Sequence, residues 1–110
     1  MLGPKGITTT ADGDIIVIDN KVYFSDSEIF TPSPCSAQGC SVFVFTPEGK
    51  TKSKFGSRGG SPSQLAGPHY VAVNSHGNIL ISDFHNHSIK VFTADGLFLF
   101  SFGSSGRNII

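Results

Sequence analysis

The residues best suited to chemistry in this sequence lie together in the stretch 83–87, which reads Asp-Phe-His-Asn-His. Asp83, His85 and His87 alternate, and this pattern could present a carboxylate and two imidazoles to a metal ion. Alternate side chains point the same way only while a strand continues, and here they stand where a strand meets a turn. Asp and Asn at such positions commonly satisfy backbone N–H groups. We therefore interpret Asp83 as a turn-capping residue and predict neither a metal site nor a cofactor.

Other sets of reactive side chains in the sequence are incomplete. Cys35 and Cys40 lie in one loop-like stretch without a second pair of zinc ligands at a typical spacing, so reduced thiols are expected rather than a disulfide framework. No G-x-S-x-G turn is available for a nucleophilic serine. Residues 56–60 are rich in glycine but lack the Lys-Ser/Thr pair of a phosphate-binding loop. The residue types therefore predict no catalytic site in this sequence.

Charge and hydrophobicity restrict the partners that the chain could have. Eight basic residues balance eight acidic ones, so no net field favours nucleic acid or an anionic membrane. Apolar runs such as Ile15 to Ile18 are far too short to span a bilayer, and the start of the chain lacks the apolar core of a secretory signal. We expect a soluble cytoplasmic chain with no membrane partner.

The sequence contains two copies of one module, and these copies must position the 83–87 stretch. Residues 3–20 match residues 67–84, and residues 41–59 match residues 88–106. In the second copy the apolar runs YVAV, ILIS, SIKVF and LFLFSF are separated by turn-forming residues about every ten positions. With ten Phe, thirteen Gly and no helical spacing of apolar residues, the pattern is typical of a four-stranded antiparallel meander in each copy.

The first copy is interrupted between its second and third strands. Its strands are predicted over residues 6–10, 15–19, 41–46 and 51–55, and a two-residue turn on Asp12-Gly13 should join the first two. The intervening residues 21–40 are rich in Ser and Pro and fit neither a helix nor a strand period, so a long disordered loop is predicted there. The chain thus divides into a first repeat, 1–59, a second repeat, 60–106, and an off-pattern tail, 107–110.

The wording of the second copy is more specific than its length. Gly67-Pro68, the run Asn-Ile-Leu-Ile-Ser-Asp at 78–83, the run Asn-His-Ser-Ile-Lys-Val-Phe at 86–92, Asp95-Gly96 and Phe102-Gly103 together resemble the NHL repeat. The pattern is most similar to the six-bladed NHL β-propeller of tripartite-motif proteins, closest to the neuronal members two and three. The resemblance implies an all-β fold of two four-stranded antiparallel blades, an incomplete ring, with the disordered insertion in the first blade.

An incomplete ring has a physical consequence for the chain. Each blade of a propeller buries its flat faces only against neighbouring blades, so two blades alone leave two apolar faces open. We therefore expect self-association through these faces, and we expect the sequence to be a fragment or a truncated isoform of a longer protein.

The resemblance also implies a non-catalytic binding or scaffold module. Relatives with this propeller are generally E3 ubiquitin ligases, in which catalysis belongs to a zinc-binding RING for which this sequence has too few Cys and His residues. The repeats would then recognise a protein partner or ubiquitination substrate. Propellers of this kind bind partners on a rim formed by turns, and aromatic and Arg side chains commonly anchor recognition. The predicted partner-binding residues are accordingly Phe84, His85, Asn86, His87, Arg58 and His69.

Two other functions are compatible with the resemblance. Some NHL propellers bind single-stranded RNA through Lys and Arg on a basic face, but the basic residues of this chain are balanced by acidic ones, which favours protein. The basic residues considered are Lys5, Lys50, Lys52, Lys54, Arg58 and Lys90. Some related six-bladed propellers are metal-dependent hydrolases or lyases whose ligands come from several blades, and two blades cannot encircle a metal ion.

Overall fold

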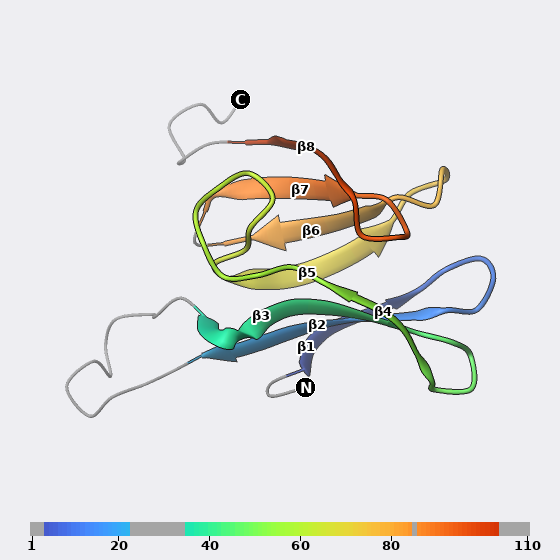
Figure 1. Cartoon of the computed structure of the whole chain (residues 1–110). Helices are drawn as coiled ribbons and strands as arrows, with labels where there is room; N and C mark the ends of the chain where they lie inside the picture. Colours follow the sequence, from blue (N-terminus) through green and yellow to red (C-terminus); the bar gives the residue numbers. More distant parts are fainter. Residues whose placement is uncertain (1–3, 23–34, 85, 104–110) are drawn as a thin grey trace.

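The computed structural model describes residues 4–22, 35–84 and 86–103, and these form two four-stranded antiparallel sheets (Figure 1). The first sheet contains β1 (Pro4–Thr9), β2 (Ile15–Val22), β3 (Cys35–Phe45) and β4 (Thr51–Phe55). The second contains β5 (Pro68–Val73), β6 (Ile79–Asp83), β7 (Ser88–Phe92) and β8 (Phe98–Phe102). Strands that follow one another in sequence are neighbours in each sheet, which confirms the predicted all-β fold of two meanders. Within the described part of the chain, no helix has the length and apolar character to cross a bilayer.

The main core lies between the two sheets. In the first sheet, Ile16 pairs with Val44 and Ile18 pairs with Val42, so these four side chains share one face and are buried on it. The second sheet contributes Ile79, Ile81 and Phe92 to the same cluster, and Leu65 from the preceding linker joins them. Fully burying an aliphatic side chain contributes about 1.5–3 kcal/mol, so this face-to-face packing is the principal force that holds the sheets together.

Two local contacts fix how closely the sheets approach. The ring centroids of Phe55 on β4 and Phe92 on β7 are 4.9 Å apart, which places an aromatic pair at one side of the interface. On β1, a Cβ atom added at Gly6 would lie 3.0 Å from the carbonyl oxygen of His69 on β5. The absence of a side chain at Gly6 therefore allows the backbones of β1 and β5 to come together.

The β1–β2 turn is a three-residue loop. The Thr10 N–H donates to the Asp14 carbonyl at 2.9 Å, and the Gly13 N–H donates to the Thr10 carbonyl at 3.0 Å. Gly13 has a φ of 89°, so the pattern is that of a type I turn followed by a left-handed glycine. The predicted two-residue turn on Asp12-Gly13 is therefore wrong. The glycine that needs positive φ was identified, but it occupies the third position of the loop rather than the second.

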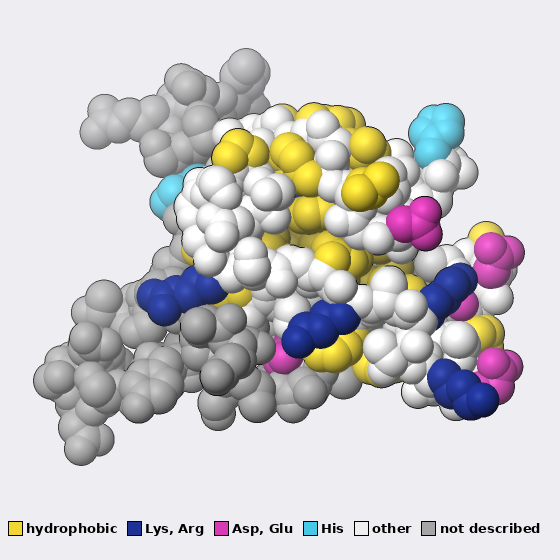
Figure 2. Space-filling model, in the orientation of Figure 1, with side chains coloured by type: hydrophobic (Ala, Val, Ile, Leu, Met, Phe, Trp, Pro, Cys, Tyr) yellow, Lys and Arg dark blue, Asp and Glu magenta, His cyan; other side chains and the backbone are white. Residues whose placement is uncertain are grey.

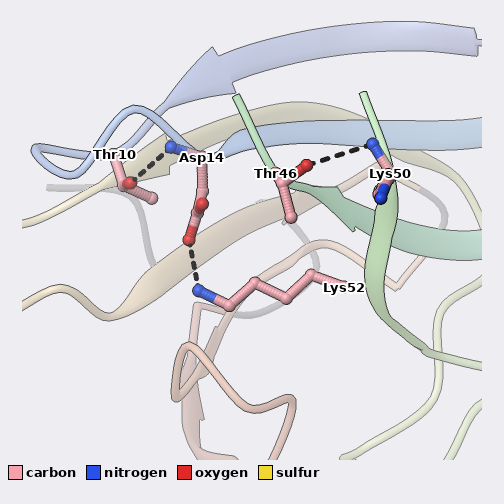
Figure 3. A network of polar contacts seen from close by, with 5 residues as sticks. All are labelled: Thr10, Asp14, Thr46, Lys50 and Lys52. Carbon is pink, nitrogen blue, oxygen red and sulfur yellow. Dashed lines mark hydrogen bonds and ion pairs between the residues drawn. The ribbon is translucent and has the colours of Figure 1, made fainter. Parts of the chain in front are cut away.

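The first-sheet turns are joined by polar contacts (Figure 3). The hydroxyl Oγ1 of Thr10 accepts from the Asp14 N–H at 3.1 Å, and Thr46 Oγ1 accepts from the Lys50 N–H in the same way at 3.1 Å. The Lys52 ammonium on β4 then donates to Asp14 Oδ2 at 2.6 Å, and this hydrogen bond raises the pKa of Lys52 above its ordinary value. The contact links the β1–β2 turn to β4, the strand that follows the β3–β4 turn.

The structure corrects two expectations about residues 21–40. β2 continues to Val22 and β3 already begins at Cys35, with Asn20 paired to Cys40, so both ends of the expected disordered loop lie in strands. Backbone pairing prolongs the hairpin although the sequence there shows no strand period. Cys40 is buried and disulfide-bonded, so the expectation of reduced thiols is also wrong. Residues 23–34 and the tail 107–110 lie outside the described residues.

Candidate partner-binding site

The candidate site begins at the end of β6, where Asp83 is buried. Its carboxylate accepts three N–H groups: Ala66 N at 3.1 Å from Oδ2, Gly67 N at 2.8 Å from Oδ1, and Asn86 Nδ2 at 2.8 Å from Oδ2. Two of these donors belong to the segment before β5 and one belongs to the turn after β6. Asp83 therefore satisfies backbone N–H groups, as the sequence predicts, but these groups lie in the segment before β5 and not in the turn after β6. No group of three or more metal-ligating side chains occurs among residues 4–22, 35–84 and 86–103.

Asn86 fixes the turn against the linker between the sheets. Besides its bond to Asp83, the Asn86 Nδ2 group donates to the Gly59 carbonyl at 3.2 Å. The linker is itself shaped by backbone bonds, because the Gly59 N–H donates to the Leu65 carbonyl at 2.9 Å and Arg58 forms an isolated bridge with Leu65. The linker between β4 and β5 is thus tied to the second sheet, and Arg58, next to Gly59, is held close to the turn.

Lys90 on β7 fastens the linker from the other side. Its side chain is only 2% exposed, and Nζ donates to the carbonyl oxygens of Ser61 at 3.1 Å and Pro62 at 2.9 Å. Burial lowers the pKa of Lys90, and the nearby charge of Asp83 opposes that shift. Lys90, one of the six basic residues considered for RNA binding, therefore does not contribute to an exposed basic face. Its role is to satisfy linker carbonyls.

An exposed aromatic cluster caps this end of the second sheet. Phe84 is 56% exposed, and its ring lies 5.3 Å from the His69 ring and 6.4 Å from the His87 ring, measured between centroids. His69 also lies 6.2 Å from the ring of Tyr70, which is 74% exposed. The φ of His87 is 52°, in the left-handed region that a non-glycine residue seldom adopts, and this angle turns the chain into β7. We call Phe84, His69, His87 and Tyr70 the aromatic rim.

The first sheet lacks this feature at the matching positions. Asn20 stands where the second repeat has Phe84, and it is buried with its Nδ2 group donating to the Pro68 carbonyl at 2.7 Å. Lys5 stands where the second repeat has His69. The matching position thus joins the sheets in the first repeat and presents an aromatic surface in the second.

Most of the predicted binding residues meet at one end of the second sheet. Phe84, His87 and His69 belong to the aromatic rim, Asn86 lies in the same turn as Phe84 and His87, and Arg58 lies in the linker segment to which Asn86 bonds. His85 lies outside the described residues. Tyr70 was not predicted. Its alternation with Val71 along β5 could have indicated a side chain on the opposite face from the core, but not its proximity to His69.

Comparison with known proteins shows what the second repeat is similar to. The NHL repeat family model matches residues 65–92. Protein brain tumor of Drosophila melanogaster is 41% identical over 54 residues, which are 49% of this chain and 5% of that protein. B-box type zinc finger protein ncl-1 of Caenorhabditis elegans is 45% identical over 47 residues, or 43% of this chain and 6% of that protein. The matched segment is therefore a small part of either relative.

Solved structures show the same arrangement of sheets. A streptogramin B lyase superimposes with a TM-score of 0.61 over 97% of this chain and 28% of its own, at 19% identity. The virginiamycin B lyase of Staphylococcus aureus gives a TM-score of 0.60 with the same coverages, at 14% identity. At such identities the likeness shows the fold alone, which is that of a β-propeller. The two sheets of this chain form an open, incomplete part of such a ring. The chain therefore carries an NHL repeat at residues 65–92, within two blades of a β-propeller.

Proposed function

We propose that this chain is a non-catalytic binding module that recognises a protein partner through the aromatic rim. The observation that carries the proposal is the exposure of Phe84 between His69 and His87, on a turn that Asp83 and Asn86 hold in place. Exposed aromatic side chains on a rigid support lose little conformational freedom on binding, and they are typical anchors of protein interfaces. Arg58, in the linker next to this turn, adds a cation for a carboxylate on the partner.

The wider role that we propose is substrate or partner recognition for a tripartite-motif E3 ubiquitin ligase in the cytoplasm. Support comes from the NHL repeat at 65–92 and from the name of the relative ncl-1, which records a B-box type zinc finger. In a longer protein of this kind, catalysis would belong to a separate zinc-binding domain and the propeller would select the target. The resemblance to neuronal tripartite-motif proteins makes neuronal proteins the first targets to screen.

A second candidate ligand is single-stranded RNA, and one observation favours it. The rings of Phe84 and His87 are exposed, the half-buried ring of His69 lies beside Phe84, and such rings can stack on unpaired bases. Beside the rim turn, phosphate contacts would come from Arg58 in the linker, because Lys90 is buried against that linker. Protein remains the preferred ligand, since RNA affinity depends mainly on several accessible cations.

Affinity capture from cell extract, followed by mass spectrometry and direct titration of the captured protein, tests the proposal. Replacing Phe84 by Ala should weaken binding by roughly 30-fold, the effect of losing an interface anchor worth about 2 kcal/mol. Leu97→Ala is the matched control, because Leu97 is also exposed but lies in the β7–β8 turn at the other end of the sheet. A captured protein that binds Phe84→Ala as tightly as the unaltered chain would refute the assignment of the rim.

A parallel titration with a random single-stranded RNA decides between the two ligands. If RNA is the ligand, affinity should fall steeply with salt and should drop in an Arg58→Ala variant. If protein is the ligand, RNA should bind no better to the unaltered chain than to Phe84→Ala at moderate salt.

A further inference from the structure

Because the two sheets are repeats of one sequence, each face of the first sheet has an equivalent face on the second sheet. On the first sheet we call the face that packs against the second sheet the forward face, represented by Ile16, Ile18, Val42 and Phe55. The repeat match places Leu80, Ser82, Ile89 and Phe102 at the corresponding positions of the second sheet. Ser82 pairs with Ile89 and Ile89 pairs with Phe102, so these side chains share one face there as well. That face is turned away from the first sheet.

The forward face of the second sheet is apolar and open. Phe102 is 51% exposed, Phe100 is also exposed, and Tyr70 of the aromatic rim borders the same surface. A shallow depression of about 290 Å³ runs across this face, lined by Tyr70, Val71, Ala72, Leu80, Ser82, Ile89 and Phe102. Figure 2 shows the second sheet from the side on which the linker crosses it, and hydrophobic side chains are visible there too. In the first sheet the equivalent residues Ile16, Ile18 and Val42 are completely buried.

The opposite face of each sheet, which we call the backward face, is covered on the second sheet and uncovered on the first. On the second sheet, Val71 and Ile81 pair with each other and face the core between the sheets. Their repeat equivalents on the first sheet are Ile7 and Val17, which also pair with each other. Ile7 is 69% exposed and borders a depression of about 270 Å³ with Val17. The chain therefore has one forward and one backward face in contact with each other, and one of each kind uncovered.

We propose that a second copy of this chain occupies the open forward face, head to tail. The backward face of the first sheet in one copy would pack on the forward face of the second sheet in the next copy, which repeats the packing already present within the chain. This occupant is favoured because the two uncovered faces are repeat equivalents of the two surfaces that form the existing interface. The contact is heterologous, so each copy keeps a free forward or backward face and can add another copy until a ring closes.

Sedimentation velocity of the 110-residue chain over a range of concentrations tests this arrangement. The unaltered chain should form dimers and larger species that grow with concentration. Phe102→Asp on the forward face and Ile7→Asp on the backward face should each raise the dissociation constant on the order of 100-fold, because a carboxylate would be buried without a partner. Mixing the two variants should restore a dimer but nothing larger, since each retains the one face that the other needs.

Two controls separate the proposal from nonspecific effects. Leu97→Asp adds the same charge at an exposed apolar residue outside both depressions, and it should associate like the unaltered chain. Circular dichroism must show a folded β-sheet spectrum for every variant, and Tyr70→Asp replaces Phe102→Asp if the latter unfolds. A monomeric unaltered chain overturns the proposal. Association that is lost in Phe102→Asp but kept in Ile7→Asp also overturns it, because that result indicates two forward faces in contact.

Discussion

Replacing Asp83 by Asn is the sharpest test of how the second repeat is held together. The buried carboxylate accepts N–H groups from Ala66, Gly67 and Asn86 with its two oxygens. Asparagine has a single acceptor oxygen, so its NH₂ group would face at least one of these donors. A hydrogen bond to a charged group contributes about 1.5–3 kcal/mol, and an unsatisfied buried donor costs about 1–3 kcal/mol. We therefore expect the free energy of unfolding to fall by about 3 kcal/mol.

Urea denaturation followed by circular dichroism measures this loss, at the same protein concentration for all variants because association would shift the midpoint. Asp95→Asn is the matched control, since Asp95 is exposed in the β7–β8 turn and the same substitution there should change stability by less than about 0.5 kcal/mol. If Asp83→Asn is as stable as Asp95→Asn, the carboxylate does not organise the linker and the turn, and the explanation of the site's rigidity is wrong.

Three further outcomes are expected. Burial lowers the pKa of Lys90 below its ordinary value of 10.5, so on raising the pH the folded state loses this proton before the unfolded state does, and the free energy of unfolding should rise with pH up to about 10.5. In urea denaturation, the difference in unfolding free energy between the unaltered chain and Lys90→Met should therefore grow over this pH range. A difference that does not change with pH would contradict the assignment. Gly6→Ala should lose about 1–3 kcal/mol in the same assay because its Cβ would meet the His69 carbonyl, whereas Gly60→Ala, with open space around the added atom, should not. Finally, Cys40 should resist alkylation until a reductant is added, as intact-mass measurement would show, and immediate modification would exclude the disulfide.

The sequence predicts the strands well because their signals are local. Alternating or continuous apolar runs and glycine-bearing turns recur at a fixed spacing, so the second-repeat strands were expected close to where they lie. The role of Asp83 was also predictable, because a carboxylate at a strand end has few other ways to be satisfied. The neuronal subgroup and the proposed limits of the repeats, 1–59 and 60–106, stay predictions.

What could not be predicted depends on contacts between distant residues. Nothing in the local pattern of β7 indicates that Lys90 is buried, because its partners are linker carbonyls about thirty residues earlier. The extension of β2 and β3 into the insertion, and the burial of Cys40, follow from pairing across the hairpin rather than from composition. The aromatic rim was found only in part, since Tyr70 joins it through its neighbour His69.

The hydrogen bonds that hold the linker bear on how the number of repeats in such a protein can change. Asp83, Asn86 and Lys90 all lie in the second sheet or its turns, yet the groups that they hold lie in the linker before β5, the first strand of that sheet. The second sheet therefore supplies the side chains that fix the linker leading into it. A gene duplication that copies one unit together with its leading segment would copy the joint geometry as well, so new units could be inserted or removed without redesigning those already present.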